Sequence, residues 1–201
     1  MTPLSGEGAR MWRYLGLVLV AAIGYLLVMG VLRKFIGQGP VNLIWVALLI
    51  VGIVIIVRNL GTNRKVADAA PEARTQALAF TPDNAHAALY ILRTQFLGKA
   101  VGVNVEIDAK PVAQLKSPRF TRILLTPGAH RIDGYTGPAS GRKPATGDIG
   151  LNAAAGEVIV LECAIEPGMI GTTTKFKRVE LGSVRARMAK TRMVAPDVAS
   201  V

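Results

Sequence analysis

The chain has 201 residues, of which 51% are hydrophobic, and a mean hydropathy of +0.38, which is high for an ordinary globular protein. Its single cysteine excludes an intramolecular disulfide framework. The net charge is +11: residues 1–74 hold eight basic and three acidic residues, and residues 75–201 hold sixteen and ten. Both parts are therefore basic, as suits an anionic lipid, a nucleic acid or an acidic partner.

Two apolar segments account for the excess hydropathy. Residues 14–32 contain no charged residue, and a second apolar run ends abruptly at Arg58. A helix of about 20 apolar residues matches the roughly 30 Å core of a bilayer. The pattern predicts two transmembrane helices over about residues 14–32 and 41–57. The short connection between them, rich in glycine and containing Pro40, predicts an antiparallel hairpin.

The basic residues beside these segments predict an orientation. Two lie in the connecting loop, Arg33 and Lys34. Six lie on the other side, which places both termini and the following domain in the cytoplasm, with a periplasmic domain as the alternative. These six are Arg10, Arg13, Arg58, Arg64, Lys65 and Arg74.

The rest of the chain divides into a linker over residues 59–85, a β domain over residues 86–181 and a basic tail over residues 182–201. The linker is polar and rich in alanine, with room for a short helix near residues 70–79. Eight short runs of β-type residues separated by turn residues follow it. They are residues 86–93, 102–108, 111–116, 119–126, 129–135, 147–152, 157–166 and 174–181.

Alternation within these runs indicates which side chains form the core. Apolar residues recur at every second position, whereas glutamate and asparagine fall between them. About eight strands in some hundred residues predict an antiparallel β-sandwich, and a small barrel has the same signature. The expected core residues are Val103, Val105, Ile107, Ile159, Leu161, Cys163 and Ile165.

The order of ALYILR, VNVEIDAKPVAQLK, LTPGAHRI and GLNAAAGEVIVLE resembles an uncharacterised bacterial cell-envelope β-sandwich domain family with a PEGA-like pattern. In that pattern an Asp-Gly hairpin precedes a Pro-Gly-x-His turn. Asp108, Pro127, Gly128 and His130 stand at the matching positions, whereas Ala109 stands where glycine is usual. The resemblance covers about residues 87–181. The resemblance implies a fold and no activity. The family is usually periplasmic and held by a lipoprotein anchor, whereas two predicted spans stand in place of that anchor here.

No residue pattern predicts an enzyme, a metal site or a cofactor. His86 and His130 have no second histidine or cysteine at ligand spacing. We expect His130 to bond its own turn and Cys163 to be a buried core thiol. The glycine-rich stretch 136–147 lacks the frame of a phosphate-binding loop and predicts a flexible hairpin loop.

Positive charge at the end of the chain gives the best candidate contact surface. Each basic residue near an anionic leaflet contributes about 1 kcal/mol, and the spacing permits a short helix as well as a solvated tail. Aromatic residues are not interleaved with these charges, so nucleic acid is not expected. The candidate lipid- or partner-contact residues are Lys175, Lys177, Arg178, Arg185, Arg187, Lys190 and Arg192.

These features together predict a noncatalytic, membrane-anchored binding or assembly module of the bacterial inner membrane. It would serve as an accessory subunit of a larger membrane complex, with membrane lipid and other membrane protein subunits as partners. The alternative is an envelope-facing module that binds a cell-wall or envelope partner. An enzyme is a third reading, which would need a polar constellation that the sequence does not display.

Overall fold

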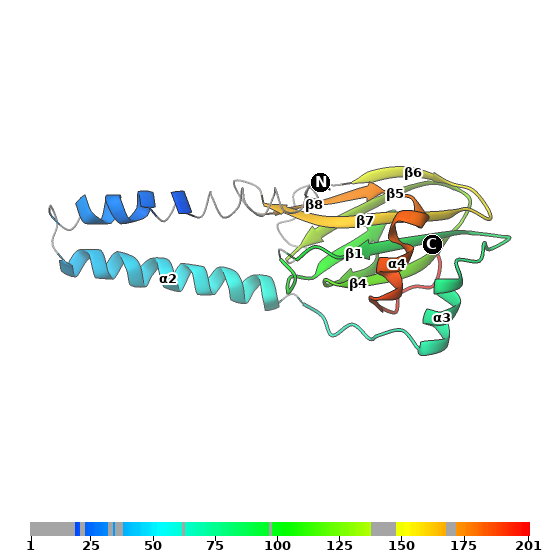
Figure 1. Ribbon diagram of the computed structural model, residues 1–201, viewed down its shortest axis with the longest axis horizontal. Coiled ribbons are helices and arrows are strands. Elements are labelled where there is room, and N and C mark those ends of the chain that lie inside the picture. Colours follow the sequence, from blue (N-terminus) through cyan, green and yellow to red (C-terminus); the bar gives the residue numbers. More distant parts are fainter. Residues whose placement is uncertain are drawn as a thin grey trace, which may run out of the picture. The chain divides into compact units, whose positions relative to one another are not determined.

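The structure is a computed structural model (Figure 1). The residues that it describes are 19–20, 23–31, 34, 38–61, 63–96, 98–137, 148–167 and 172–201. The chain divides into two compact units, Met1–Ile55 and Ile56–Val201.

Two helical segments make up the described part of the first unit. Residues 23–31 are helical, and α2 (Gln38–Gly61) follows them. The rings of Tyr25 and Trp45 contact each other, with centroids 4.5 Å apart and planes tilted by 58°. One helical turn from each ring, Met29 and Val41 are buried. The two segments therefore contact each other through the Tyr25–Trp45 pair.

The prediction of two transmembrane helices is contradicted. A membrane-spanning helix needs about 20 consecutive, predominantly apolar residues. Among the residues that the structure describes, no helix has both the length and the apolar character to cross a membrane. The multi-pass inner-membrane localisation rested on those helices and is contradicted with them. Arg10, Arg13 and Arg33, which entered the predicted orientation, lie outside the described residues.

The second unit contains two β-sheets. A five-stranded sheet has the order β8-β7-β1-β4-β9, and a four-stranded sheet has the order β3-β2-β5-β6. The strands are β1 (Ala87–Arg93), β2 (Val103–Ile107), β3 (Lys110–Leu115), β4 (Arg119–Leu125), β5 (Gly128–Thr136), β6 (Ile149–Ala153), β7 (Val158–Pro167), β8 (Thr172–Arg178) and β9 (Arg192–Met193).

A continuous apolar core joins the two sheets. Buried side chains of β1, β4 and β7 from one sheet pack with those of β2, β3 and β5 from the other. All seven core residues predicted by alternation belong to this cluster, so that prediction is confirmed. Alternation succeeds because successive side chains of a strand point to opposite faces of the sheet.

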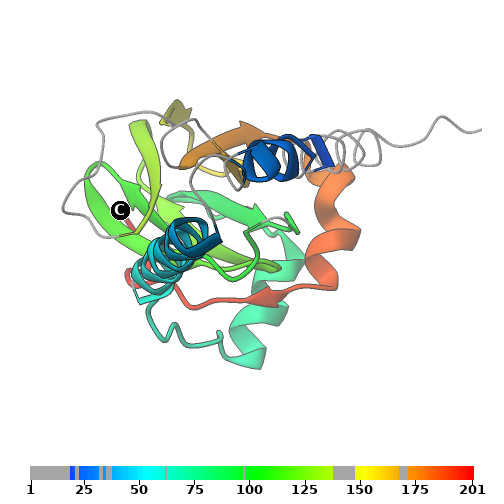
Figure 2. The same cartoon turned by 90° about the vertical axis from the view of Figure 1, so that its left-hand side faces the viewer.

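Two short helices cover the outer face of the five-stranded sheet. α3 (Pro71–Ala79) has proline at its first turn and ends at Phe80, which adopts a left-handed conformation with φ of 53°. α4 (Leu181–Ala189) lies beside it, and both helices are on the same side of the domain (Figure 2). Their buried residues pack on the outward side chains of β1, β4 and β7 in a second apolar cluster. The domain is therefore built of three layers.

The predicted antiparallel sandwich is wrong in its strand pairing. Each of the eight predicted runs overlaps one of the strands β1–β8, but β1 pairs with β7 in parallel, and β4 pairs with β9 in parallel. Alternation shows which face of a strand is buried but carries no information about which strand it pairs with. The sequence analysis therefore did not predict the mixed sheet. Residues 182–201, expected as a tail, contain most of α4 and the ninth strand.

Candidate functional site

The seven predicted contact residues lie on β8, on α4 and in the segment after α4. Three of them belong to β8, an edge strand of the five-stranded sheet. Lys175 forms an ion pair with Glu166 (2.6 Å), and Arg178 forms one with Glu157 (2.6 Å). The amide of Ala154 and then the Arg178 guanidinium lower the pKa of Glu157. Two of the predicted contacts on β8 are thus engaged by acidic partners from their own sheet.

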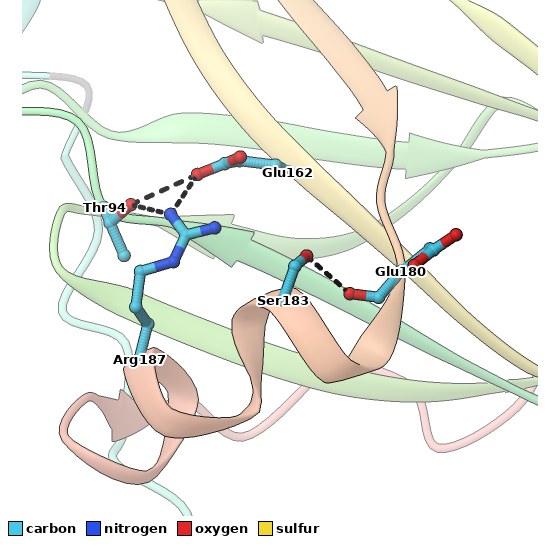
Figure 3. A network of polar contacts seen from close by, with 5 residues as sticks. All are labelled: Thr94, Glu162, Glu180, Ser183 and Arg187. Carbon is cyan, nitrogen blue, oxygen red and sulfur yellow. Dashed lines mark hydrogen bonds and ion pairs between the residues drawn. The ribbon is translucent and has the colours of Figure 1, made fainter. Parts of the chain in front are cut away.

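A second group of polar contacts joins α4 to the sheet (Figure 3). Arg187 Nη1 donates to Glu162 Oε1 (2.7 Å) and lies 3.4 Å from Thr94 Oγ1. The Thr94 hydroxyl also donates to Glu162 (3.3 Å). Lys177 stands opposite Glu162 in the β7–β8 register. The structure therefore places Lys177 across the sheet from the glutamate that binds Arg187, an arrangement that no sequence pattern predicted.

The other three predicted contacts are dispersed over the helical layer. Arg185 lies over the ring of Phe80, with its guanidinium carbon 5.1 Å from the ring centroid. Arg192 approaches Asp68 at 3.7 Å, and Lys190 follows the end of α4. Exposed ion pairs contribute about 0–1 kcal/mol each, so these contacts restrain the side chains weakly. Lysine on an edge strand also opposes pairing with another sheet, which is a structural role for Lys175 and Lys177.

Asp108 and His130 meet at one end of the β domain. His130 Nδ1 lies 2.7 Å from Asp108 Oδ2, and its Nε2 lies 2.8 Å from the carbonyl oxygen of Thr126. Asp108 Oδ1 accepts the backbone N–H of Arg131 (2.9 Å). Burial raises the pKa of the Asp108 carboxyl, but the hydrogen bonds from the Arg131 amide and the His130 ring outweigh burial, so the pKa lies below its ordinary value. His130 therefore bonds its own turn, as expected from the sequence, and also the preceding hairpin.

His86 lies in an Asp83-centred turn. Asp83 Oδ1 accepts the backbone N–H groups of Ala85 (2.9 Å) and His86 (2.8 Å) and lies 3.1 Å from His86 Nδ1. The Ala85 amide, followed by the His86 side chain, lowers the pKa of Asp83. Within the described ranges, no group of three His, Cys, Asp or Glu side chains is placed to hold a metal ion. Most of the predicted loop at 136–147 lies outside the described residues.

Arg93 is the polar residue that the sequence analysis missed. It ends β1 and is completely buried, with its guanidinium donating to the carbonyl oxygens of Gly98 (2.8 Å), Val101 and Leu115 (2.9 Å). Burial lowers its pKa from the ordinary value for arginine. The only signal in the sequence is its place at the end of an apolar run, where a basic residue ordinarily marks the return to solvent.

Cys163 lies in the apolar core, and burial raises its pKa to about 12. We predict that the native thiol reacts with iodoacetamide at least about a thousandfold more slowly than the thiol of the unfolded chain, because the thiolate is the nucleophile and forms only when the core opens. Alkylation followed by mass spectrometry measures both rates. In a Cys163→Ala background, Ser200→Cys provides an exposed control thiol. Equal native rates for the two positions would contradict the buried assignment.

Comparison of the chain with protein-family models, with curated proteins and with solved structures found no match. The resemblance to a PEGA-like β-sandwich family therefore stays a prediction. The geometry defines a two-sheet β domain with a helical layer, preceded by a helix with an apolar surface.

Most of the exposed large apolar side chains in the described residues belong to α2. Eleven large apolar side chains of this helix are between 41% and 72% exposed. They include two runs of four consecutive positions, 43–46 and 48–51, so they surround the helix and do not form one stripe. The eleven are Leu43, Ile44, Trp45, Val46, Leu48, Leu49, Ile50, Val51, Ile53, Val54 and Val57.

Proposed function

We propose that this protein is a noncatalytic assembly module, an accessory subunit that binds a partner protein through the apolar surface of α2 and displays the β domain as a second contact surface. The exposure of α2 carries the proposal. Burying one large aliphatic side chain contributes about 1.5–3 kcal/mol, so eleven exposed ones favour association strongly. Exposed apolar patches beyond a few hundred Å² mark interaction sites.

Helices of a partner subunit are the occupant that fits this surface. A helix that is apolar on every side is ordinarily buried among other apolar segments. Near the contact between Tyr25 and Trp45, Val41 of α2 is buried, whereas the eleven apolar side chains named above stay exposed. Because the backbone of α2 forms its hydrogen bonds internally, a partner needs to supply apolar side chains and no specific polar group.

Within the β domain, residues with catalytic potential are occupied by structural contacts. His130 bonds two turns, His86 bonds Asp83, and Cys163 is buried. Three of the seven basic residues, Lys175, Arg178 and Arg187, form ion pairs with glutamates. The surface therefore carries both charges, which supports a role in protein contact.

Photocrosslinking in living cells tests the proposal. A photoreactive amino acid placed at Leu49, which is 63% exposed, is expected to give a discrete protein adduct, whereas the same group at exposed Lys110 in the β domain gives none of that size. The charged variant Val46→Glu, with Val46→Ala as its matched control, should abolish the adduct, because burying an unpaired carboxylate is strongly unfavourable. An adduct containing only lipid, or only a second copy of this chain, would overturn the proposal.

A further inference from the structure

Two separate stretches of the chain pair with the edge of β4 that faces away from β1. The beginning of β4 pairs in parallel with β9. The chain then leaves this edge, and the backbone N–H of Asp197 donates to the carbonyl of Val112 on β3, in the other sheet (2.8 Å). It returns with residues 199–201, the resident stretch, in which Ser200 forms an isolated parallel bridge with Leu124. The resident stretch is therefore no continuation of β9.

Three backbone hydrogen bonds hold the resident stretch on β4. The N–H of Leu124 donates to the Ala199 carbonyl (3.1 Å), and the Leu124 carbonyl accepts the N–H of Val201 (2.9 Å). The N–H of Thr126 donates to the Val201 carbonyl (2.8 Å). This is the pattern of a parallel ladder, in which alternate residues face the neighbouring strand. The backbone of Ser200 is thus directed away from β4.

Side chains contribute to this attachment at one position. Val201 is partly buried and packs against the main apolar core, whereas Val198, Ala199 and Ser200 are exposed. When an extended segment adds to a sheet edge, main-chain hydrogen bonds supply the affinity and a few side-chain positions supply the specificity. The edge of β4 therefore selects an apolar side chain in the place of Val201 and tolerates many residues in the place of Ser200.

The part of β4 beneath the resident stretch has a composition that favours pairing with another strand. Charged side chains and proline on an edge strand oppose such pairing, and the edge strand β8 carries Lys175 and Lys177. By contrast, residues 123–126 are isoleucine, two leucines and threonine. When the resident stretch is lifted, two N–H groups and one carbonyl on this edge become open to a strand of another protein.

From these contacts we infer that the edge formed by residues 123–126 is a strand-addition site, which the resident stretch fills in the isolated chain and which receives an extended segment of a partner protein. The partner segment joins β4 in parallel and places an apolar side chain where Val201 lies. Release of the resident stretch requires only local opening, because few contacts hold it. The inference is independent of the association through α2.

A partner segment fits this site better than a second copy of the chain. The second copy would offer the same three bonds as the resident stretch, which its own tether keeps at an effective concentration of the order of millimolar. Exchange between copies therefore gains nothing. A partner segment that pairs with a longer part of β4 forms more backbone hydrogen bonds than the resident stretch and displaces it.

Hydrogen exchange of the full chain measures whether the site opens. The amides of Leu124 and Thr126 are bonded to the resident stretch, whereas those of Leu89 and Ile91 belong to β1, which is paired on both sides. After correction for intrinsic rates, we expect the two β4-edge amides to exchange at least about a hundredfold faster than the two β1 amides. Equal protection would show that the resident stretch leaves β4 only when the domain unfolds, and would exclude the inference.

Peptide binding to full-length variants tests the site itself. The probe is a fluorescent peptide with the sequence of residues 195–201, and its anisotropy reports binding. Val201→Glu should release the resident stretch, because a carboxylate is unfavourable against the apolar core, and should strengthen binding of the probe about tenfold or more. Ser200→Glu adds the same charge at an exposed position and should leave binding as it is in the unmodified chain. Slow alkylation of Cys163 verifies that each variant is folded.

N-methylated probes distinguish strand addition from other modes of binding. Methylation of the nitrogen that corresponds to Val201 removes the N–H that the Leu124 carbonyl accepts, so this probe should not bind the Val201→Glu chain. Methylation at the position of Ser200, whose backbone is directed away from β4, should be tolerated. A folded Val201→Glu chain that binds no probe, or binds both methylated probes equally, would overturn the inference. Dimers of the unmodified chain that exchange residues 199–201 would also overturn it, because the occupant would then be a second copy.

Discussion

Replacing Arg93 by methionine is expected to lower the free energy of unfolding of the β domain by about 3 kcal/mol. Methionine fills much of the same volume but donates no hydrogen bond, so the carbonyls of Gly98, Val101 and Leu115 lose the donor that the guanidinium supplies. A buried carbonyl left unsatisfied costs about 1–3 kcal/mol, and removal of a desolvated charge offsets part of the sum. Arg93→Lys should recover only part of the loss, because an ammonium lacks the planar fork.

The rate of Cys163 alkylation in urea measures this loss. Both tryptophans, Trp12 and Trp45, precede the β domain in the sequence, whereas the only thiol lies in its core. Arg187→Met is the matched control, since it removes an arginine whose side chain is 43% exposed and should cost about 0–1 kcal/mol. The role assigned to Arg93 would be wrong if the two methionine variants were equally stable.

The sequence predicted the strands better than their arrangement. Alternation located Val105 and Leu161 in the core because burial of every second side chain is a local property. The parallel pairing of β1 with β7 joins segments some seventy residues apart and leaves no local pattern. The sequence left a short helix and a solvated tail as alternatives after residue 181, because α4 buries only Val184 and Met188, too few for a clear amphipathic period.

At the candidate site, too, local sequence patterns located the residues but not their partners. Sequence identified positive charge at Lys175, Arg178 and Arg187, but their acidic partners lie on β7 or just before it. Ion pairs between strands depend on register, which single-residue patterns do not encode. The sequence came closer to predicting the Asp108–His130 contact, since both residues belong to the turn motifs that carried the resemblance.

The burial of Arg93 is another feature that the sequence could not predict. A basic residue after an apolar strand is ordinarily solvated. Only the loop that returns over Arg93, from Gly98 to Val101, buries the guanidinium and supplies its acceptors. Its importance is therefore a property of tertiary structure, and the expected loss in Arg93→Met is a test of the fold at that loop.

Gly134→Ala is expected to destabilise the β domain by about 1–3 kcal/mol. Gly134 lies on β5, where the four-stranded sheet meets the side chains of β8. A Cβ atom there would lie 2.8 Å from Phe176 Cζ and 2.8 Å from Thr174 Cγ2, closer than such contacts allow. To make room for the methyl group, either Phe176 must change rotamer or the two sheets must separate locally, and both changes cost free energy.

Gly150→Ala is the matched control for this substitution, because Gly150 lies on neighbouring β6 and a Cβ there meets nothing within 4 Å. It should be neutral or stabilising by up to about 1 kcal/mol, as alanine restricts the unfolded chain more than glycine does. In a Phe176→Leu background the cost of Gly134→Ala should shrink, since two of the three closest atoms belong to the ring. Urea-dependent alkylation of Cys163 measures all four variants. An unchanged cost in that background would show that the strain is not against Phe176 and would direct attention to the Thr174 side chain.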